Sequence, residues 1–161
     1  MTPAPYAGGM DTIVFRRARA SDLPAIIALL ADDPLGRERE RVSLPPLPAY
    51  EAAFAAIDSD PNQLLAVVTE DERVVGTLQI TFIPGISRQG ALRGQIEAVR
   101  IAADRRGDGL GHRVFEWAIS ECRARGCVMM QLTTDAGRSD AHRFYEQLGF
   151  TASHLGYKKP L

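Results

Sequence analysis

The stretch that decides the fold is residues 95–125, QIEAVRIAADRRGDGLGHRVFEWAISECRAR. Its first part, 95–101, carries Ile96, Val99 and Ile101 at the density of a strand. A tight turn follows at 105–111, with three glycines at alternate positions, and a helix is predicted to begin near Gly109. In this helix the apolar residues recur at three- and four-residue spacing, namely Leu110, Val114, Trp117, Ala118 and Cys122.

The glycine turn is suited to bind an anion. Glycine has no Cβ, so its backbone can take positive φ and approach a bulky ligand closely. The start of a helix also leaves N–H groups unpaired and directs the positive end of the helix dipole into the turn. Each such contact with a negative charge contributes roughly 0.3–1 kcal/mol when exposed and up to about 2 kcal/mol when partly buried. The glycines alone fit a plain strand-to-helix connection equally well.

Two common phosphate-binding motifs do not match this turn. A nucleotide P-loop ends in Gly-Lys-Ser/Thr, whereas this turn ends in Gly-Leu-Gly-His. A Rossmann fingerprint requires G-x-G-x-x-G after an early strand, whereas G-x-G-x-G occurs here late in the chain. The sequence therefore disfavours a nucleotide-phosphate-binding protein.

Two segments resemble motifs of one known family. Residues 106–111, RGDGLG, resemble the R/Q-x-x-G-x-G/A motif of the GNAT superfamily of acyl-CoA-dependent N-acyltransferases. Residues 141–150, AHRFYEQLGF, resemble the C-terminal signature of the same family. The two motifs occur in the family's order and spacing, which makes the match specific.

The rest of the chain supplies the elements that this resemblance implies. We predict strands at 12–17, 64–69, 74–83, 95–101 and 128–133, and a final strand or pair of strands at 150–159. Helices are predicted at 21–30, 48–57, 109–125 and 139–148. Residues 32–48 are expected to form a loop or a loosely held helical piece, 86–94 a polar connection, and 1–11 a flexible lead-in. We expect one α/β (α+β) domain over 1–161.

Composition narrows the function classes. The chain has 161 residues, 45% hydrophobic and 24% charged, with a net charge of −1. This charge gives no bulk electrostatic reason to bind nucleic acid or an anionic membrane, and no apolar run has the length of a membrane helix. The N-terminus lacks a secretion signal. We expect Cys122 and Cys127 to be reduced, no metal site, and a cytoplasmic protein, with a homodimer left open.

The family resemblance implies where an acyl-CoA would bind. In GNAT proteins a mixed, mostly antiparallel sheet has helices on both faces, and the strands that match 95–101 and 128–133 splay apart. The pantetheine arm lies in the opening and pairs with the first strand, at positions that match Val99, Arg100 and Ile101. The pyrophosphate lies on backbone amides at positions that match Arg106, Gly107, Asp108, Gly109, Leu110, Gly111 and His112.

Acetylation of an amine needs proton transfers. A primary amine with a pKa near 10.4 is about 99.9% protonated at neutral pH, so its neutral form costs about 4.6 kcal/mol. A base, or a site that lowers the amine pKa, is therefore expected, together with an acid that protonates the leaving thiolate. Tyr145 matches the position of the family's general acid and cofactor contact. The alternative is a core tyrosine, because Ala141, Phe144, Tyr145 and Leu148 form one helical stripe.

Glu97 is the candidate base, because several family members have an acidic residue at this point of the strand. A solvated strand carboxylate is the equally weighted alternative, and His142 and His154 are further candidates. Arg138 replaces the Asn that contacts the cofactor in many members, and it could reach a phosphate or make no contact.

The resemblance thus implies an acetyl-CoA-dependent N-acetyltransferase that acts on a primary amine of a small molecule. One alternative is an acetyltransferase that acts on a protein amine. Another is a non-catalytic acyl-CoA-binding module, which the presence of Tyr145 and Glu97 weakly disfavours. The expected acceptor walls, residues 31–48 and 84–94, carry no readable code for the acceptor.

Overall fold

The computed structural model describes residues 13–161. The strands are β1 (Ile13–Arg17), β2 (Gln63–Glu70), β3 (Arg73–Pro84), β4 (Leu92–Ile101) and β5 (Met129–Gln131). The helices are α1 (Leu23–Ala31), α2 (Gly36–Arg39), α3 (Pro48–Ser59), α4 (Ser87–Gly90), α5 (Leu110–Ala124) and α6 (Ser139–Gln147). Single 3-10 turns precede α1 (Ala20–Asp22) and follow β4 (Ala103–Arg105). Within the described part of the chain, no helix is both long and apolar enough to cross a membrane.

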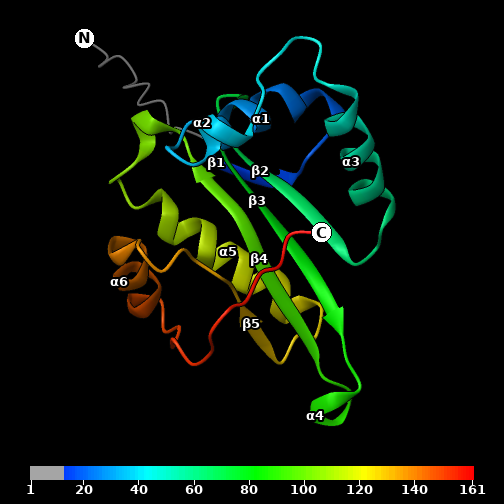
Figure 1. Cartoon of the computed structure of the whole chain (residues 1–161), viewed down its shortest axis with the longest axis vertical. Coiled ribbons are helices and arrows are strands. Elements are labelled where there is room, and N and C mark those ends of the chain that lie inside the picture. The colour runs from blue at the N-terminus through cyan, green and yellow to red at the C-terminus, as the bar shows by residue number, and fades with distance from the viewer. Residues whose placement is uncertain (1–12) are drawn as a thin grey trace, which may run out of the picture.

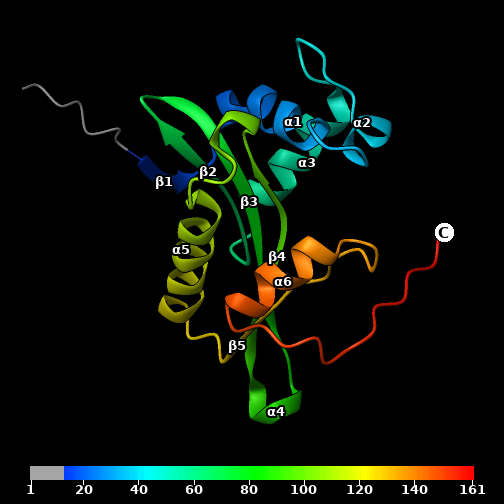
Figure 2. The same ribbon diagram turned by 90° about the vertical axis from the view of Figure 1, so that its left-hand side faces the viewer.

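The strands form one five-stranded sheet in the order β1-β2-β3-β4-β5. Pairing is antiparallel from β1 to β4, and only β4 and β5 are parallel. Helices α1 and α3 cover one face of the sheet and α5 covers the other (Figures 1 and 2). The predicted fold class, a mostly antiparallel mixed sheet with helices on both faces, is confirmed.

The main core lies between the sheet and α5. Helix α5 buries the face that its periodicity predicts, with Leu110, Val114, Phe115, Ala118 and Cys122 against the sheet. The helix lies very close to β4, since a Cβ on Gly94 would stand 2.3 Å from the Cys122 Sγ atom. Only glycine leaves room for this contact. A smaller cluster, containing Ala18, Ile26 and Val67, lies on the α1 side of the sheet.

A β-bulge interrupts β4. Gln79 of β3 lies opposite Glu97, and Thr77 lies opposite Arg100, so one residue of β3 faces two residues of β4. Ala98 takes a φ of 53° to form the bulge. The extra residue reverses the alternation of side chains along the strand. Ile96 packs in the α5-side core before the bulge, and Val99 and Ile101 pack against the same core after it.

Strands β4 and β5 separate soon after they meet. Their pairing covers only Arg93 with Met129, Gly94 with Met130 and Gln95 with Gln131. From Ile96 to Ile101, β4 therefore has no strand partner on its β5 side within the described residues. This is the opening between the central strands that the family resemblance implies.

Several boundaries differ from the predictions. Strand β4 begins at Leu92 rather than at residue 95, and β5 spans three residues rather than 128–133. The connection at 86–94 contains the short turn α4 and the first residues of β4. The prediction of a final strand or pair of strands at 150–159 is wrong, because residues 150–161 form no helix or strand. The predicted lead-in at 1–11 and the first residue of the predicted strand at 12–17 lie outside the described residues.

Candidate active site

The glycine turn connects the end of β4 to the start of α5. Gly107 and Gly109 have φ values of 85° and 86°, and Gly109 is the N-cap of α5. This left-handed conformation costs roughly 1–2 kcal/mol in any residue that carries a Cβ. Nothing lies within 4 Å of the position that a Cβ would take on either glycine. The two glycines are therefore required by backbone conformation and leave the outside of the turn open.

Asp108 occupies part of the helix N-terminus. Its carboxylate accepts a hydrogen bond from the Leu110 amide at 3.1 Å and pairs with the Arg105 Nε atom at 2.7 Å. The hydrogen bond from Arg105 and then the Leu110 amide hold the pKa of Asp108 below its ordinary value. The Leu110 amide is thus committed to Asp108, and the next two amides of the first turn, those of Gly111 and His112, remain for a ligand.

Arg106 connects the glycine turn to the end of β4 and to the loop after α1. Its Nε atom donates to the Ile101 carbonyl at 3.0 Å, and its Nη2 atom lies 3.1 Å from both the carbonyl and the carboxylate of Asp32. Its amide donates to the Ala103 carbonyl at 3.4 Å. Arg106 therefore fixes the position of the turn relative to β4 and to the loop after α1.

Arg100 lies along the opening of β4. Its Nη1 atom donates to the Val99 carbonyl at 2.9 Å, and its Nη2 atom pairs with the Asp33 carboxylate at 2.8 Å. Asp33 also accepts the Gly36 amide at 2.7 Å. Burial opposes ionisation of Asp33, but the Gly36 amide and Arg100 outweigh burial and lower the pKa of Asp33. The opening is thus bordered by a fixed guanidinium group.

Tyr145 is held in a cage of aromatic rings. Its ring centroid lies 5.6 Å from those of Phe115 and Phe144 and 6.2 Å from that of Phe150, in edge-to-face contacts. Burial raises the pKa of the Tyr145 phenol, although Arg138 and Arg100 oppose this effect. The phenol is therefore protonated at neutral pH and can donate a proton. Arg138 itself is exposed at the N-cap of α6.

Glu97 is exposed on the other face of the sheet, the face that α1 and α3 partly cover. Its cross-strand neighbour is Gln79, and the two side chains share a face. The surrounding strands carry a row of amides, which we call the glutamine face: Gln63, Gln79, Gln95 and Gln131. Gln79 and Thr81 donate to Gln63 at 3.0 and 2.9 Å, and Gln131 donates to Gln95 at 2.8 Å. Water and polar solutes can therefore reach Glu97.

The other predicted base candidates lie elsewhere. The His142 Nε2 atom is 3.1 Å from the Asp135 carbonyl, and the His154 Nδ1 atom is 2.7 Å from the Ser153 hydroxyl in the exposed C-terminal segment. Among the described residues, neither histidine forms a hydrogen bond with Glu97, Arg100 or Tyr145.

The structure brings most of the remaining predicted residues together. A Cβ on Gly111 would lie 3.5 Å from the Phe144 ring, so the glycine turn meets α6 beside Tyr145. The phenol of Tyr145 is within electrostatic reach of Arg100 and Arg138. Glu97 is on the same strand as Arg100, on the opposite side of the bulge from Val99 and Ile101.

Sequence analysis missed three features of this region: the Arg106–Asp32 contact, the Arg100–Asp33 contact and the glutamine face. The glutamine face has one signal in the sequence: polar residues stand two positions apart in each of two predicted strands, Gln79 and Thr81 in one and Gln95 and Glu97 in the other. The two ion pairs join residues that are far apart in the sequence, so no spacing rule indicates them.

An apolar cavity of about 140 Å³ lies between α1, α3 and the sheet. Its floor is made by Leu65, Thr77, Gln79 and Ala98, and its walls include Tyr50 and Phe54 of α3. Because Gln79 and Ala98 are the neighbours of Glu97 across and along the strands, the cavity adjoins the glutamine face. The expected acceptor walls at 31–48 and 84–94 contribute no residue to the lining of this cavity.

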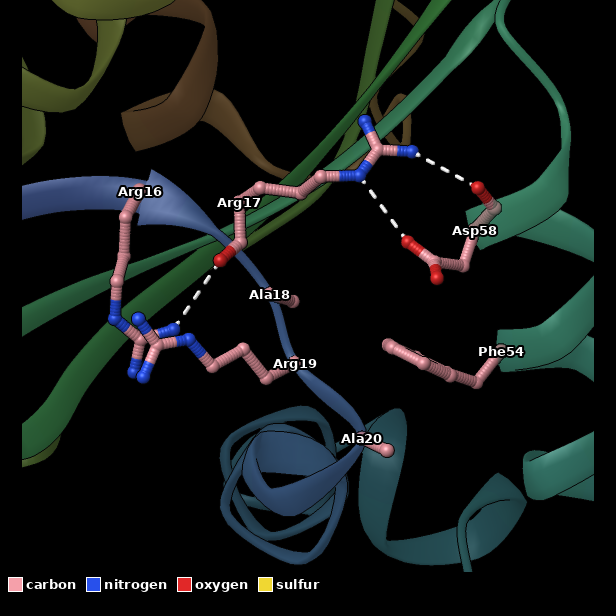
Figure 3. Close-up of a pocket in the computed structure, with 7 residues that line it drawn as sticks. All are labelled: Arg16, Arg17, Ala18, Arg19, Ala20, Phe54 and Asp58. Atoms are coloured by element: carbon pink, nitrogen blue, oxygen red, sulfur yellow. Dashed lines mark hydrogen bonds and ion pairs between the residues drawn. The ribbon is translucent and has the colours of Figure 1, made fainter.

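A larger hollow of about 570 Å³ lies at the β1 edge of the sheet (Figure 3). It is lined by residues 16–20, Phe54 and Asp58. Figure 3 shows Arg17 bonded to Asp58, and Arg16 pairs with Asp22 at 2.7 Å. The hollow lies at the opposite edge of the sheet from the β4–β5 opening, and two of its arginines are neutralised by these carboxylates. We assign no function to it.

Comparison with known proteins identifies the family. Residues 24–150 match the acetyltransferase (GNAT) family. An aminoalkylphosphonate N-acetyltransferase from Salmonella typhimurium is 30% identical over 70% of this chain and 73% of its own. A glucosamine 6-phosphate N-acetyltransferase from Trypanosoma brucei brucei is 31% identical over 67% of this chain and 74% of its own.

Among solved structures, a protein from Bacillus halodurans C-125, named a transcriptional regulator, is 46% identical with a TM-score of 0.90. The alignment covers 93% of this chain and 100% of that protein. The family match spans most of the described residues, and the fold and both motif positions agree with it. The chain therefore belongs to the GNAT family of acetyltransferases.

Proposed function

We propose that this protein is an acetyl-CoA-dependent N-acetyltransferase whose acceptor is a primary amine of a small molecule. The observation that carries the proposal is the contact between the glycine turn and α6, the helix that bears Tyr145, together with the unpaired edge of β4 beyond its short pairing with β5. In this proposal a candidate anion site, an unpaired strand edge and a protonated phenol would act together on one ligand.

The described residues fit acetyl-CoA. The amides of Gly111 and His112, beside the left-handed Gly107 and Gly109, would hold the pyrophosphate. The unpaired edge of β4 near Val99 and Ile101 would hold the pantetheine arm. Arg100, which is paired with Asp33, and Arg138 would add positive charge near it, since both act on the Tyr145 phenol. When bound, acetyl-CoA supplies an activated thioester carbonyl.

Glu97 and Tyr145 would carry out the two proton transfers of the reaction, as base and acid respectively. Glu97, on the open glutamine face, would accept a proton from the acceptor ammonium directly or through water. Tyr145, on α6 beside the glycine turn, would donate its phenolic proton to the departing thiolate sulfur. Each transfer is worth typically about 10²–10⁴-fold in rate. The raised pKa of Tyr145 favours this role, because the phenol keeps its proton at neutral pH.

The acceptor surface favours a small amphipathic amine. The glutamine face offers amide donors and acceptors, and Arg93, which donates to Gln131 at 3.1 Å, adds one positive charge. The adjoining apolar cavity of about 140 Å³ has room for a short hydrocarbon group and not for a folded protein segment. The names of the Salmonella and Trypanosoma relatives describe small amines that carry a phosphonate or phosphate.

An amine panel tests the proposal. Release of free thiol from acetyl-CoA would be measured with aminoalkylphosphonates, hexosamine phosphates, aliphatic and aromatic amines, and a lysine-containing peptide. We expect turnover with at least one small amine and little with the peptide. Calorimetric titration should show coenzyme A binding in the micromolar range and far weaker binding of ATP and NAD. Comparable ATP binding would contradict the assignment of the glycine turn.

The second candidate is a non-catalytic acyl-CoA-binding module. The name of the Bacillus halodurans relative favours a regulatory role of this kind, although the net charge of −1 gives no bulk attraction to nucleic acid. Coenzyme A binding without turnover on any amine would support this candidate. A cytoplasmic location is part of the proposal, because both cysteines are free thiols in the structure.

A further inference from the structure

Two ion pairs join the β2–β3 hairpin to the segment that leads into the glycine turn. Arg105 pairs with Glu70, the last residue of β2, and Asp104 pairs with Arg73, the first residue of β3, at 2.7 Å. Residues 103–105 form the 3-10 turn after β4, and the glycine motif follows it directly. The end of the hairpin thus holds the approach to the glycine turn.

Glu70 and Arg105 form the less exposed of these two pairs. Their side chains are 12% and 22% exposed, compared with 60% and 53% for Asp104 and Arg73. The Oε1 atom of Glu70 is buried, so the charge of Arg105 compensates it in place of water. An ion pair that is shielded in this way is weakened little by salt, and it holds both partners in one geometry.

Arg105 connects Glu70 to the glycine turn. Its Nη1 atom pairs with Glu70, and its Nε atom donates to the Oδ2 atom of Asp108 at 2.7 Å. The Oδ1 atom of Asp108 in turn accepts the Leu110 amide at 3.1 Å. We call Glu70, Arg105 and Asp108 the turn relay. The relay runs from a buried carboxylate oxygen to the first residue of α5.

The turn relay determines which amides of α5 are open to a ligand. Both oxygens of Asp108 are engaged, one by Arg105 and one by Leu110, so neither is left for the amides of Gly111 and His112. A carboxylate that was not held in this way would be attracted to these amides, because the start of a helix stabilises a negative charge. It would then occupy the place of a bound anion and repel that anion.

We propose that Glu70 is a positioning residue for the acyl donor, which acts through Arg105 to keep the Asp108 carboxylate out of the diphosphate site. The inference rests on the proposed function, in which the amides of Gly111 and His112 hold the diphosphate of coenzyme A. Glu70 reaches the turn through Arg105 and not directly. Its role is to supply the fixed charge that keeps the Arg105 guanidinium in place.

The first test compares two ligands that differ in the diphosphate. Coenzyme A carries this group, whereas pantetheine, the thiol end of the same molecule, lacks it. Glu70→Gln keeps the shape of the side chain and removes its charge. We expect its affinity for coenzyme A to fall roughly 3- to 10-fold and its affinity for pantetheine to stay within about twofold of wild type. NMR titration of the 15N-labelled chain measures both, and a general loss of structural order would weaken both ligands alike.

Glu72→Gln is the matched control. Glu72 lies in the same hairpin turn and is exposed, so removal of its charge should leave both affinities at their wild-type values. A double-mutant cycle locates the effect. Glu70→Gln should cause no further loss in an Asp108→Asn background, because the carboxylate that the relay restrains is then absent. If Glu70→Gln fails to fold, Glu70→Asp, which keeps the charge and shortens the reach to Arg105, should show the same selective loss to a smaller extent.

A signal from the ligand-free protein separates this inference from the proposed function. The Leu110 amide resonance should shift in Glu70→Gln and not in Glu72→Gln, whether or not coenzyme A binds. Failure of the wild type to bind coenzyme A would contradict the proposed function, and the Leu110 resonance would still decide whether Glu70 acts on the turn. An unshifted Leu110 resonance, an unchanged coenzyme A affinity, an equal loss for pantetheine, or a loss that persists in the Asp108→Asn background would each overturn the role of Glu70.

Discussion

The two faces of the sheet are organised by different means. On the α5 side, backbone conformation determines the structure. Two left-handed glycines shape the turn, and a close helix–strand contact at Gly94 fixes the position of α5. On the side of α1 and α3, the structure is held by hydrogen bonds and ion pairs between side chains, those of Asp22, Asp33 and the glutamine face. A ligand common to a whole family can be held by backbone, whereas a ligand that differs between members must be chosen by side chains.

The largest effect should come from Tyr145, on the α5 side. Tyr145→Phe keeps the ring in its aromatic cage and removes only the hydroxyl, so turnover should fall about 10- to 1,000-fold if the phenol protonates the thiolate. Coenzyme A affinity should change only a few-fold. Steady-state kinetics and titration calorimetry check both. Tyr157→Phe, which removes a hydroxyl from an exposed ring, should leave turnover unchanged.

A merely structural Tyr145 would behave differently. Turnover of Tyr145→Phe would stay near normal, and at most about 1–2 kcal/mol of stability would be lost if a buried partner became unpaired. Measuring the melting temperature of the same variant separates these outcomes.

The next effect should come from the backbone of the turn. Gly109→Val forces a β-branched residue into a φ of 86°, which costs about 1–3 kcal/mol, or about 5- to 150-fold in coenzyme A affinity if strain distorts the bound turn. Gly85→Val is the matched control, because its Cβ would make an ordinary contact of 3.6 Å with the Ala91 carbonyl. Full affinity in the Gly109 variant would mean that the turn does not hold the phosphates.

On the other face, the expected effect is on stability rather than affinity. Asp22 accepts two hydrogen bonds from Arg16, at 2.7 and 2.9 Å, and one from the Arg19 amide at 2.7 Å. Asp22→Asn should lower the free energy of unfolding by about 1.5–3 kcal/mol, the usual worth of hydrogen bonds to a charged group. Asp58→Asn, which alters an exposed pair with Arg17, should cost under about 1 kcal/mol.

The pH dependence gives the sign of the Asp22 effect. Arg16 holds the pKa of Asp22 below its ordinary value of 3.8, so the ionised carboxyl stabilises the fold. This contribution is present above pH 3.8 and is lost as the pH falls through the lowered pKa. Urea unfolding of wild type and Asp22→Asn should therefore converge in strong acid. A constant difference at all pH values would argue against an ionic role.

The smallest effect should be that of salt on acceptor binding. A net charge of −1 implies no long-range steering, so KM for the acceptor should change only a few-fold between low and physiological ionic strength. A steep loss of affinity would indicate that the charged segment 37–41, RERER, takes part in acceptor binding.

The same contrast explains what could be predicted from the sequence. The turn at 105–111 and the periodicity of α5 are local features, and both are confirmed in the structure. The Arg100–Asp33 and Arg106–Asp32 contacts depend on how distant segments meet, so no local pattern contains them. The site roles of Tyr145, Glu97 and the turn remain predictions.

The error at the C-terminus has a similar cause. The final strand or pair of strands predicted at 150–159 does not form, because a strand exists only where a second strand pairs with it, and this segment has no such partner among residues 13–161. The shortening of β5 follows the same rule, because its predicted residues 132 and 133 extend beyond the point where β4 turns away.

The bulge at Ala98 adds to β4 one residue that the alternation of its neighbours does not need. Ile96 and Val99 pack in the same core although they are three positions apart, and Glu97 and Arg100 share the opposite face. Deleting Ala98 would therefore restore a regular ladder with β3 and leave both pairs on the faces that they now occupy. A residue inserted elsewhere in β4, with no second bulge to absorb it, would exchange the faces of every residue on one side of the insertion. We therefore expect β4 to tolerate the loss of Ala98 far better than the gain of a residue.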